Sequence, residues 1–388
     1  MRVKLKDIFD LQMGKTPSRS NLEYWNTTDY KWISIADLTK TSKYIFETKE
    51  YLSKSAIKDS GIKVIPANTV VMSFKLSIGK TAITKEDMYS NEAIMAFKDK
   101  HVINIIPEYI FYLFKYKNWE EGSNKAVMGK TLNKATLSEI EVEICSIEKQ
   151  RQIVNILDKI MSAVDGRKQE LQLLDELIKA RFVEMFGNPV TNEKGWKQRQ
   201  LGEITTKIGS GATPKGGKEA YQEEGITLIR SMNVHNGLFE YKELAHISEE
   251  QAEKLDNVTI EENDVLLNIT GASVARSCVV PSKILPARVN QHVCIIRCNQ
   301  CIVPEFLNKL LIDDNYQRLL WSIAEAGATR EAITKQQVES LQIIMPPIEL
   351  QEQFADFVHQ VDKSKVAVQK ALDETQILFD SLMQKYFG

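Results

Sequence analysis

The sequence lacks the features that mark membrane, secreted and disulfide-stabilised proteins. No stretch reaches the roughly 18 consecutive apolar residues of a membrane span. The first residues, MRVKLKDIFD, alternate charged with apolar side chains, so they lack the apolar core of a signal peptide. Five cysteines, odd in number and unevenly spaced, argue against a disulfide framework. We therefore expect a cytoplasmic protein without a membrane partner.

Two Gly-Lys-Thr triplets lack the additional glycine that a phosphate-binding loop requires. In such a loop a glycine stands five residues before the Gly-Lys pair, so that backbone N–H groups can surround a phosphate. Phe9 stands there before Gly14, and Phe74 before Gly79. The triplets therefore do not indicate a nucleotide site, and the turns need another explanation.

Neither sign of charge dominates, because the formal net charge is only −2. With 43% hydrophobic and 26% charged residues, the composition is that of a globular protein, long enough for two or three domains. Two long segments nevertheless contain no acid, namely those between Asp59 and Glu86 and between Asp264 and Glu305. The basic residues in these segments are Lys63, Lys75, Lys80, Lys85, Arg276, Lys283, Arg288 and Arg297. They predict two electropositive surfaces.

The chain contains an internal repeat with an offset of about 200 residues, which determines the architecture. The matched pairs are LKDIFDLQMGKTP (5–17) with LGEITTKIGSGATP (201–214), ANTVVMS (67–73) with ENDVLLN (262–268), IGKTAI (78–83) with VARSCV (274–279), NEAIMAF with NQHVCII, and IEKQRQIVNILDKI (147–160) with IELQEQFADFVHQV (348–361). The second copy keeps a Gly-x-Thr-Pro turn without the lysine, so the turn is either structural or a contact to a DNA backbone.

Each copy begins with about 145 residues that predict mixed α/β structure and then changes abruptly to helix. Gly187-Asn188-Pro189 ends the first helix, and Pro346-Pro347 precedes the second. The apolar residues of both helices follow heptad spacing in the same register, so we expect an antiparallel coiled coil. The seam residues are Ile153, Leu157, Ile160, Leu171, Leu174, Ile178, Phe354, Val358, Val361, Val368, Leu372 and Phe379. Arg167 and Lys365 interrupt this seam, and either set its register or extend outward to solvent.

Two variable α/β domains, each followed by a long helix, resemble the DNA-specificity subunit of type I restriction–modification enzymes. The helix entries that carry the resemblance are Ile147-Glu148-Lys149-Gln150 and Pro347-Ile348-Glu349-Leu350-Gln351. The resemblance implies an α+β fold with target recognition domains at 1–146 and 191–347 and spacer helices at 147–190 and 348–388. Each domain would read one half of a split, asymmetric site in double-stranded DNA.

The family further implies that the helices dock two modification subunits, which bind S-adenosylmethionine and methylate adenine. A restriction subunit can join such a complex, but the sequence does not show whether this chain has one. The specificity subunit itself carries no cofactor and no activity. In agreement, the only Pro-Pro pair has the wrong neighbours for the catalytic tetrapeptide of an adenine methyltransferase. Other hypotheses remain open: a specificity subunit whose partner fuses nuclease and methylase, a coiled-coil scaffold with protein-binding domains, and a self-contained endonuclease.

DNA readout requires basic, amide or hydroxyl side chains. The candidates are Thr16, Arg19, Lys75, Lys80, Lys130 and Lys134 in the first copy, and Thr213, Lys215, Asn233, His235, Arg276 and Arg330 in the second. Lys80 and Arg276 keep positive charge at matching positions while their neighbours differ. His292, Cys294, Cys298 and Cys301 resemble a zinc site. Because the matching stretch of the first copy has no cysteine, we expect no metal and interpret the thiols as packed side chains.

Overall fold

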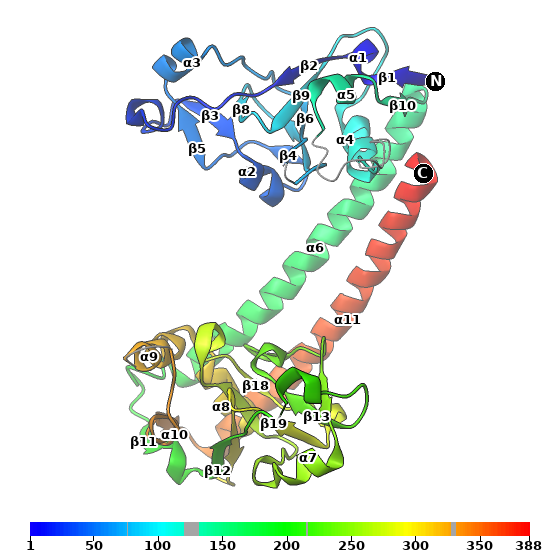
Figure 1. Ribbon diagram of the computed structural model, residues 1–388. Coiled ribbons are helices and arrows are strands. Elements are labelled where there is room, and N and C mark those ends of the chain that lie inside the picture. The colour runs from blue at the N-terminus through cyan, green and yellow to red at the C-terminus, as the bar shows by residue number, and fades with distance from the viewer. Residues whose placement is uncertain (76, 120–131, 215, 327–330) are drawn as a thin grey trace. The chain divides into compact units, whose positions relative to one another are not determined.

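The two copies of the sequence form two compact units in a computed structural model that describes residues 1–75, 77–119, 132–214, 216–326 and 331–388. Unit 1 comprises Met1–Lys168 and Lys370–Gly388, and unit 2 comprises Gln169–Gln369. Each unit therefore contains one α/β region together with one half of each long helix, α6 (Ile147–Phe186) and α11 (Ile348–Phe387) (Figure 1). None of the described helices is long and apolar enough to cross a membrane.

Unit 1 is built on a five-stranded sheet of order β2-β9-β6-β7-β4 and a three-stranded sheet of order β5-β3-β8. Only the β4–β7 and β3–β8 pairs are parallel. The strands are β2 (Phe9–Met13), β3 (Tyr30–Ile33), β4 (Tyr44–Ile45), β5 (Glu50–Leu52), β6 (Val70–Ser73), β7 (Thr81–Thr84), β8 (Tyr89–Ser90) and β9 (Ile94–Asp99). A separate antiparallel pair, β1 (Arg2–Lys4) with β10 (Glu141–Glu143), joins the two ends of the α/β region.

The helices of unit 1 begin where the sequence supplies capping groups. Ser34 and Ser53 accept hydrogen bonds from the first turns of α2 and α3, and Pro107 opens α4, where a missing N–H costs nothing. The helices are α1 (Leu5–Ile8), α2 (Ile35–Lys40), α3 (Lys54–Ser60), α4 (Pro107–Tyr116) and α5 (Lys134–Ser138). Helix α4 buries six consecutive residues, Tyr109 to Phe114, between the large sheet and α6, so it forms the centre of the unit 1 core.

Unit 2 repeats this topology. Its four-stranded sheet, β12-β20-β17-β18, corresponds to β2-β9-β6-β7, and its three-stranded sheet, β16-β13-β19, corresponds to β5-β3-β8 with one parallel pair again. The strands are β11 (Lys197–Gln200), β12 (Thr205–Ser210), β13 (Ile226–Ile229), β14 (Val234–His235), β15 (Leu238–Phe239), β16 (Ala245–Ile247), β17 (Val265–Asn268), β18 (Ser277–Val279), β19 (Ala287–Val289), β20 (Val293–Cys298) and β21 (Gln342–Met345). The helices are α7 (Glu249–Glu253), α8 (Pro304–Leu311), α9 (Asp314–Glu325) and α10 (Lys335–Glu339). Helix α8 takes the place of α4, and the β14–β15 hairpin and α9 have no counterpart among the described elements of unit 1.

Both long helices begin with a buried glutamine that ties the helix to its own α/β region. Gln150 Nε2 donates to the carbonyls of Asn104 and Cys145, both at 3.0 Å, and its Oε1 accepts from Ile106 N–H at 2.9 Å. At the other end, α6 stops at Gly187, whose φ of +76° favours a residue without a side chain. Gly187-Asn188-Pro189 therefore ends α6, as we expected from the sequence.

The apolar face of α6 packs against α11 within each unit, and the helices run antiparallel. In unit 1, Ile153 and Leu157 share a core with Phe379 and Met383. In unit 2, Ile178, Phe182 and Phe186 share a core with Phe354, Val358 and Val361. Of the expected seam, Ile153, Leu157, Ile178, Phe354, Val358, Val361, Leu372 and Phe379 are buried, and Ile160, Leu171, Leu174 and Val368 are half-buried.

The two charged residues in the seam make polar contacts between the helices. Arg167 Nη1 donates to Thr375 Oγ1 at 2.8 Å within unit 1. Lys365 Nζ lies 2.6 Å from Asp175 Oδ1 within unit 2, and that pairing raises the pKa of the lysine even though burial opposes it. Both side chains are thus fixed across the seam, and neither extends freely to solvent.

Candidate nucleic-acid interface

Lys80 and Arg276 occupy the same position in the two units. Ser73 N–H, at the end of β6, donates to the Lys80 carbonyl at 2.9 Å, just before β7. Asn268 N–H, at the end of β17, donates to the Arg276 carbonyl at 2.8 Å, just before β18. The repeat alignment of the sequence therefore describes a real backbone equivalence. One basic side chain leaves the same strand connection in each unit.

Arg276 lies beside another candidate from the sequence. Its Nη1 is 3.5 Å from Nδ1 of His235, the last residue of β14, and both side chains are half-buried. The β14–β15 hairpin is held there because Gly237 N–H donates to the Ser277 carbonyl at 2.8 Å and Asn236 Oδ1 accepts from Ser277 N–H at 3.3 Å. The fold thus brings together two residues that are 41 positions apart.

The Gly-x-Thr-Pro turns make one set of contacts in both units. A Cβ at Gly14 would lie 2.3 Å from the Ser90 carbonyl oxygen, and a Cβ at Gly211 would lie 1.7 Å from that of Val289, which stands at the equivalent strand position, so only glycine fits. The Thr16 hydroxyl donates to the Glu92 carboxylate. The equivalent Thr213 hydroxyl donates to the Gln291 side chain. Because a hydroxyl carries one proton, each threonine's donor is engaged within the protein, and its donation to a phosphate would require this hydrogen bond to open.

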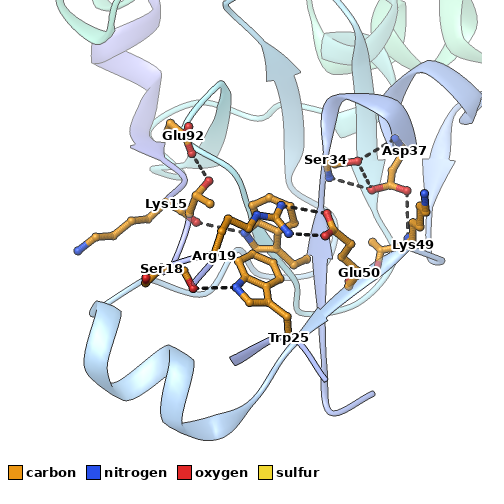
Figure 2. Close-up of polar contacts among 12 residues, drawn as sticks. Lys15, Ser18, Arg19, Trp25, Ser34, Asp37, Lys49, Glu50 and Glu92 are labelled. Carbon is orange, nitrogen blue, oxygen red and sulfur yellow. Dashed lines mark hydrogen bonds and ion pairs between the residues drawn. The ribbon is translucent and has the colours of Figure 1, made fainter. Parts of the chain in front are cut away.

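Arg19 is already engaged within the protein (Figure 2). Its guanidinium lies 3.7 Å from the ring centre of Trp25 and pairs in a bidentate manner with Glu50, with Nη2 3.1 Å from Oε2. Trp25 Nε1 in turn donates to the Ser18 carbonyl at 3.0 Å. Bidentate pairing and stacking fix the plane of a guanidinium. Arg19 therefore organises the loop between β2 and β3, and contact with DNA would require this pairing to open.

Glu92 lies at the meeting point of several candidates. The Thr16 hydroxyl lowers the pKa of this carboxyl, and the nearby charges of Lys75 and Arg19 add to the effect, while burial opposes it. Gln291 stands at this position in unit 2. A carboxylate accepts hydrogen bonds only, whereas an amide also donates, so the two units present different groups beside the same turn.

Asn233 is fully buried and has a structural role. Its Nδ2 donates to the carbonyls of Glu240 at 3.0 Å and Lys242 at 3.2 Å, and its Oδ1 accepts from Arg230 N–H at 3.1 Å. In this conformation its amide cannot reach a base edge. We therefore leave it out of the proposed interface.

The remaining candidates differ in exposure. Lys80 and Lys134 are exposed, the latter in the first turn of α5, and Lys75 is half-buried. Lys130, Lys215 and Arg330 lie outside the described residues. Two other basic residues of the second acid-free segment are neutralised. Arg288 Nη2 pairs with Asp256 at 2.7 Å, and Arg297 Nε pairs with the buried Asp264 at 2.8 Å.

Sequence reasoning did not identify Trp25 and Glu50 as partners of Arg19, nor Asp256 and Asp264 as partners of the two arginines. Sequence spacing did not reveal these pairs, because each acidic partner lies in a different strand or loop from its arginine, and Asp264 stands just outside the second acid-free segment. No periodicity or motif in the sequence marks them. An electropositive surface in unit 2 is therefore smaller than the basic residues alone suggest.

The cysteines of β20 face the packed interior. Burial raises the pKa of Cys294 and Cys298 to about 12, so neither thiol ionises near neutral pH. His292 Nδ1 lies 2.5 Å from Thr270 Oγ1, and Cys301 is exposed in the following turn. Among the described residues, no group of three or more His, Cys, Asp or Glu side chains is arranged to hold a metal ion.

Comparison with known proteins identifies the family. The family model "Type I restriction modification DNA specificity domain" matches residues 1–176 and 193–375. The MjaIX specificity subunit of Methanocaldococcus jannaschii is 25% identical over 405 residues, covering 98% of this chain and 91% of the relative. The EcoR124I/EcoR124II specificity subunit of Escherichia coli is 26% identical and covers 41% of each chain.

Solved structures show the same fold. The S subunit of M. genitalium superposes with a TM-score of 0.59 at 14% identity, over 100% of this chain and 96% of that chain. A component of a type I restriction–modification system solved for its complex assembly has a TM-score of 0.59 at 18% identity, over 100% and 97%. The chain therefore belongs to the type I restriction–modification DNA specificity family, as a non-catalytic subunit that recognises DNA.

Proposed function

We propose that the protein reads a split, asymmetric sequence in double-stranded DNA, one half with each α/β region. In this proposal residues 1–146 and 191–347 are the two target recognition domains, and 147–190 and 348–388 are the spacer helices. The helices dock two modification subunits, which supply S-adenosylmethionine and methyl transfer, and restriction subunits join this complex. Such a complex acts on cellular DNA, so we place it in the cytoplasm.

The observation that carries the proposal is the equivalence of Lys80 and Arg276. The same strand connection ends in a cation in both units. Other polar groups of the two units differ, because His235 lies beside Arg276 and Gln291 replaces Glu92 beside the Gly-x-Thr-Pro turn. Sequence-independent phosphate contacts need a repeated positive charge, and base readout needs variable polar groups beside it. This pattern suits two domains that bind DNA similarly but read different bases.

The proposed interface comprises the candidate side chains that remain accessible. In unit 1 these are Lys75, Lys80 and Lys134, and in unit 2 they are His235 and Arg276. Lys130, Lys215 and Arg330 stay in the proposal on sequence grounds alone. Arg19, Thr16 and Thr213 position the loops that carry the interface. In this proposal the first group of residues contacts DNA, and Arg19, Thr16 and Thr213 keep the loops that carry that group in place.

The outer faces of the long helices support the docking part of the proposal. Several large apolar side chains lie outside the seam and are exposed by 38 to 70%: Ile156, Leu173, Leu177, Val183, Val366, Ile377 and Leu378. Apolar groups that repeat along a helix and find no partner in the chain are typical of protein–protein contact surfaces. Modification subunits that cover these side chains would remove them from water.

Domain exchange tests the proposal. The chain is co-expressed with its modification subunits after residues 191–347 are replaced by the corresponding region of a relative, and the methylated motif is mapped by single-molecule sequencing. We expect one half of the motif to change and the other half to remain. An exchange of 1–146 should change the opposite half. If either exchange altered both halves, the two regions would not read DNA independently.

A further inference from the structure

A group of lysines outside the proposed interface meets at one cavity of unit 1. The cavity has a volume of about 530 Å³ and lies among α2, α4, α6 and α11. Lys40 ends α2, Lys115 lies near the end of α4, and Lys168 lies on α6, and all three line the cavity. All three residues keep exposed surface, so a ligand can approach them from solvent, although packing around Lys115 removes part of the hydration of its ammonium group.

None of the three lysines forms an ion pair with a described residue, although two carboxylates share the cavity. Asp165 Oδ2 accepts from Ser42 Oγ at 3.1 Å, and Asp380 Oδ1 accepts from Gln376 Nε2 at 2.9 Å. Within the described part of the chain, no ion pair closer than 4.0 Å involves Lys40, Lys115 or Lys168. By contrast, Lys365 on α11 in unit 2 pairs with both Asp175 and Asp362, at 2.6 and 3.5 Å.

The positive charges also repel one another. The pKa of Lys115 is lowered, first by loss of hydration and further by the charges of Lys168 and Lys80, while Asp165 opposes the shift. Lys80 is the cation at the β6–β7 connection, so one residue of the proposed DNA interface lies close enough for its charge to act on Lys115. A bound anion would relieve this repulsion, because each ammonium would then face an opposite charge.

We propose that Lys40, Lys115 and Lys168 bind the phosphodiester backbone of the spacer DNA, between the two half-sites. This inference rests on the proposed function and adds a contact that does not depend on base sequence. The lysines project from α2, α4 and the spacer helix α6, beside Lys80 rather than among the variable side chains. A phosphodiester fits because it needs only cationic donors, and the hydroxyls of Thr41 and Ser42 already donate to Asp37 and Asp165. The contact anchors the DNA to the helix that separates the half-sites.

The chain supplies a matched control on the same helix. Lys159 is exposed and lies nine residues before Lys168, which places it on the opposite face of α6 at about 100° per residue. Lys168→Gln and Lys159→Gln therefore remove the same charge from the same helix and differ only in the face affected. Lys115→Gln/Lys168→Gln extends the series. Glutamine preserves most of the side-chain stem.

The first measurement is the salt dependence of binding of the full-length chain to a cognate duplex and to a random duplex. Each phosphate contact contributes about 0.9 to the slope of log K against log salt, so Lys168→Gln should reduce the loss of affinity between roughly 50 and 200 mM salt by about threefold. The reduction should be equal for both duplexes, and Lys159→Gln should match the wild type. Equal slopes for Lys168→Gln and Lys159→Gln would overturn the inference.

The second measurement locates the contact on the DNA. Neutral methylphosphonate linkages placed in the spacer should weaken binding of the wild-type chain and have little further effect on Lys115→Gln/Lys168→Gln. If the methylphosphonates weakened binding by the same factor in the wild type and in the double variant, the lysines would not contact these phosphates. If the double variant kept its DNA binding but lost salt-sensitive affinity for the modification subunits, the occupant would be an acidic protein surface, and the inference would be wrong. A wild-type chain with no salt-sensitive duplex binding would instead contradict the proposed function itself.

Discussion

Gln150 and Gln351, 201 residues apart, make the same hydrogen bonds in the two units. Each is fully buried, and each donates to the chain that enters its own long helix, Gln150 to the Cys145 carbonyl at 3.0 Å and Gln351 to the Pro346 carbonyl at 2.9 Å. Each also accepts from a backbone N–H just before the helix that follows the large sheet, that of Ile106 or Val303. The Glu-x-Gln entry motif therefore has a structural cause.

Replacement of either glutamine by leucine should destabilise the protein. Gln351→Leu leaves the Val303 N–H and the Pro346 carbonyl buried without partners, which costs about 1–3 kcal/mol for each unsatisfied group. Chemical denaturation measures the loss. Gln353→Leu, two residues further along the same helix and exposed, should change the free energy of unfolding by less than about 0.5 kcal/mol. Equal effects of the two substitutions would argue against the hydrogen-bonded role.

Asn233→Ala should lower the stability of the protein without changing the DNA sequence that it recognises. The substitution removes the acceptor of Arg230 N–H and the donor to the Glu240 and Lys242 carbonyls, so we expect a loss of about 1–3 kcal/mol in the free energy of unfolding. The methylated motif should remain the same below the melting temperature. A variant of normal stability that accepted a different base at one position would instead show that Asn233 reads DNA.

Charge reversal at the equivalent strand connections should weaken DNA binding. Lys80→Glu or Arg276→Glu should cost about 1–3 kcal/mol of binding free energy and reduce the salt slope, because a cation near a phosphate is replaced by an anion. Titration of a labelled duplex at two salt concentrations measures both quantities. Lys159→Glu, on the outer face of α6, serves as the charge-matched control for Lys80→Glu. Unchanged affinity of a folded variant at both salt concentrations would remove that residue from the interface.

Lengthening both helices by one heptad should lengthen the DNA spacer. Insertions after Gln169 and after Lys370 fall where unit 1 meets unit 2 along each helix, and seven residues keep the apolar face in register. The added length is about 10 Å at 1.5 Å per residue, which corresponds to about three base pairs at 3.4 Å each. Because three base pairs also rotate the duplex, a smaller shift with weaker binding is the alternative outcome.

Motif mapping after co-expression with the modification subunits measures this spacer. An insertion of three or four residues in one helix alone should disrupt the seam and destabilise the protein, which provides the control. A stable and active heptad variant with the original spacing would mean that the helices act only as a docking surface.

The amino-acid sequence alone determined the repeated architecture. Local rules were sufficient for this level: heptad spacing gave both long helices, Gly187 ended the first of them, and Pro107 and Pro304 opened the equivalent helices α4 and α8. The match of Lys80 with Arg276 also came from the sequence, because strand ends and turns follow each other in the same order in both copies. Heptad spacing, helix ends and the order of strands and turns depend on residues that are close in the chain, so they can be predicted from the sequence.

Only the tertiary structure decided which candidate side chains are free to bind. Arg19 is stacked on Trp25 and paired with Glu50. The side chain of Asn233 is hydrogen-bonded to the backbone of its own loop, and Arg297 is paired with Asp264. The cavity of three lysines is assembled from α2, α4 and α6, which are far apart in the chain. Whether a charge is paired depends on which groups lie within a few ångströms of it. The fold sets these distances between segments that are far apart in the chain, and their separation in sequence does not predict them.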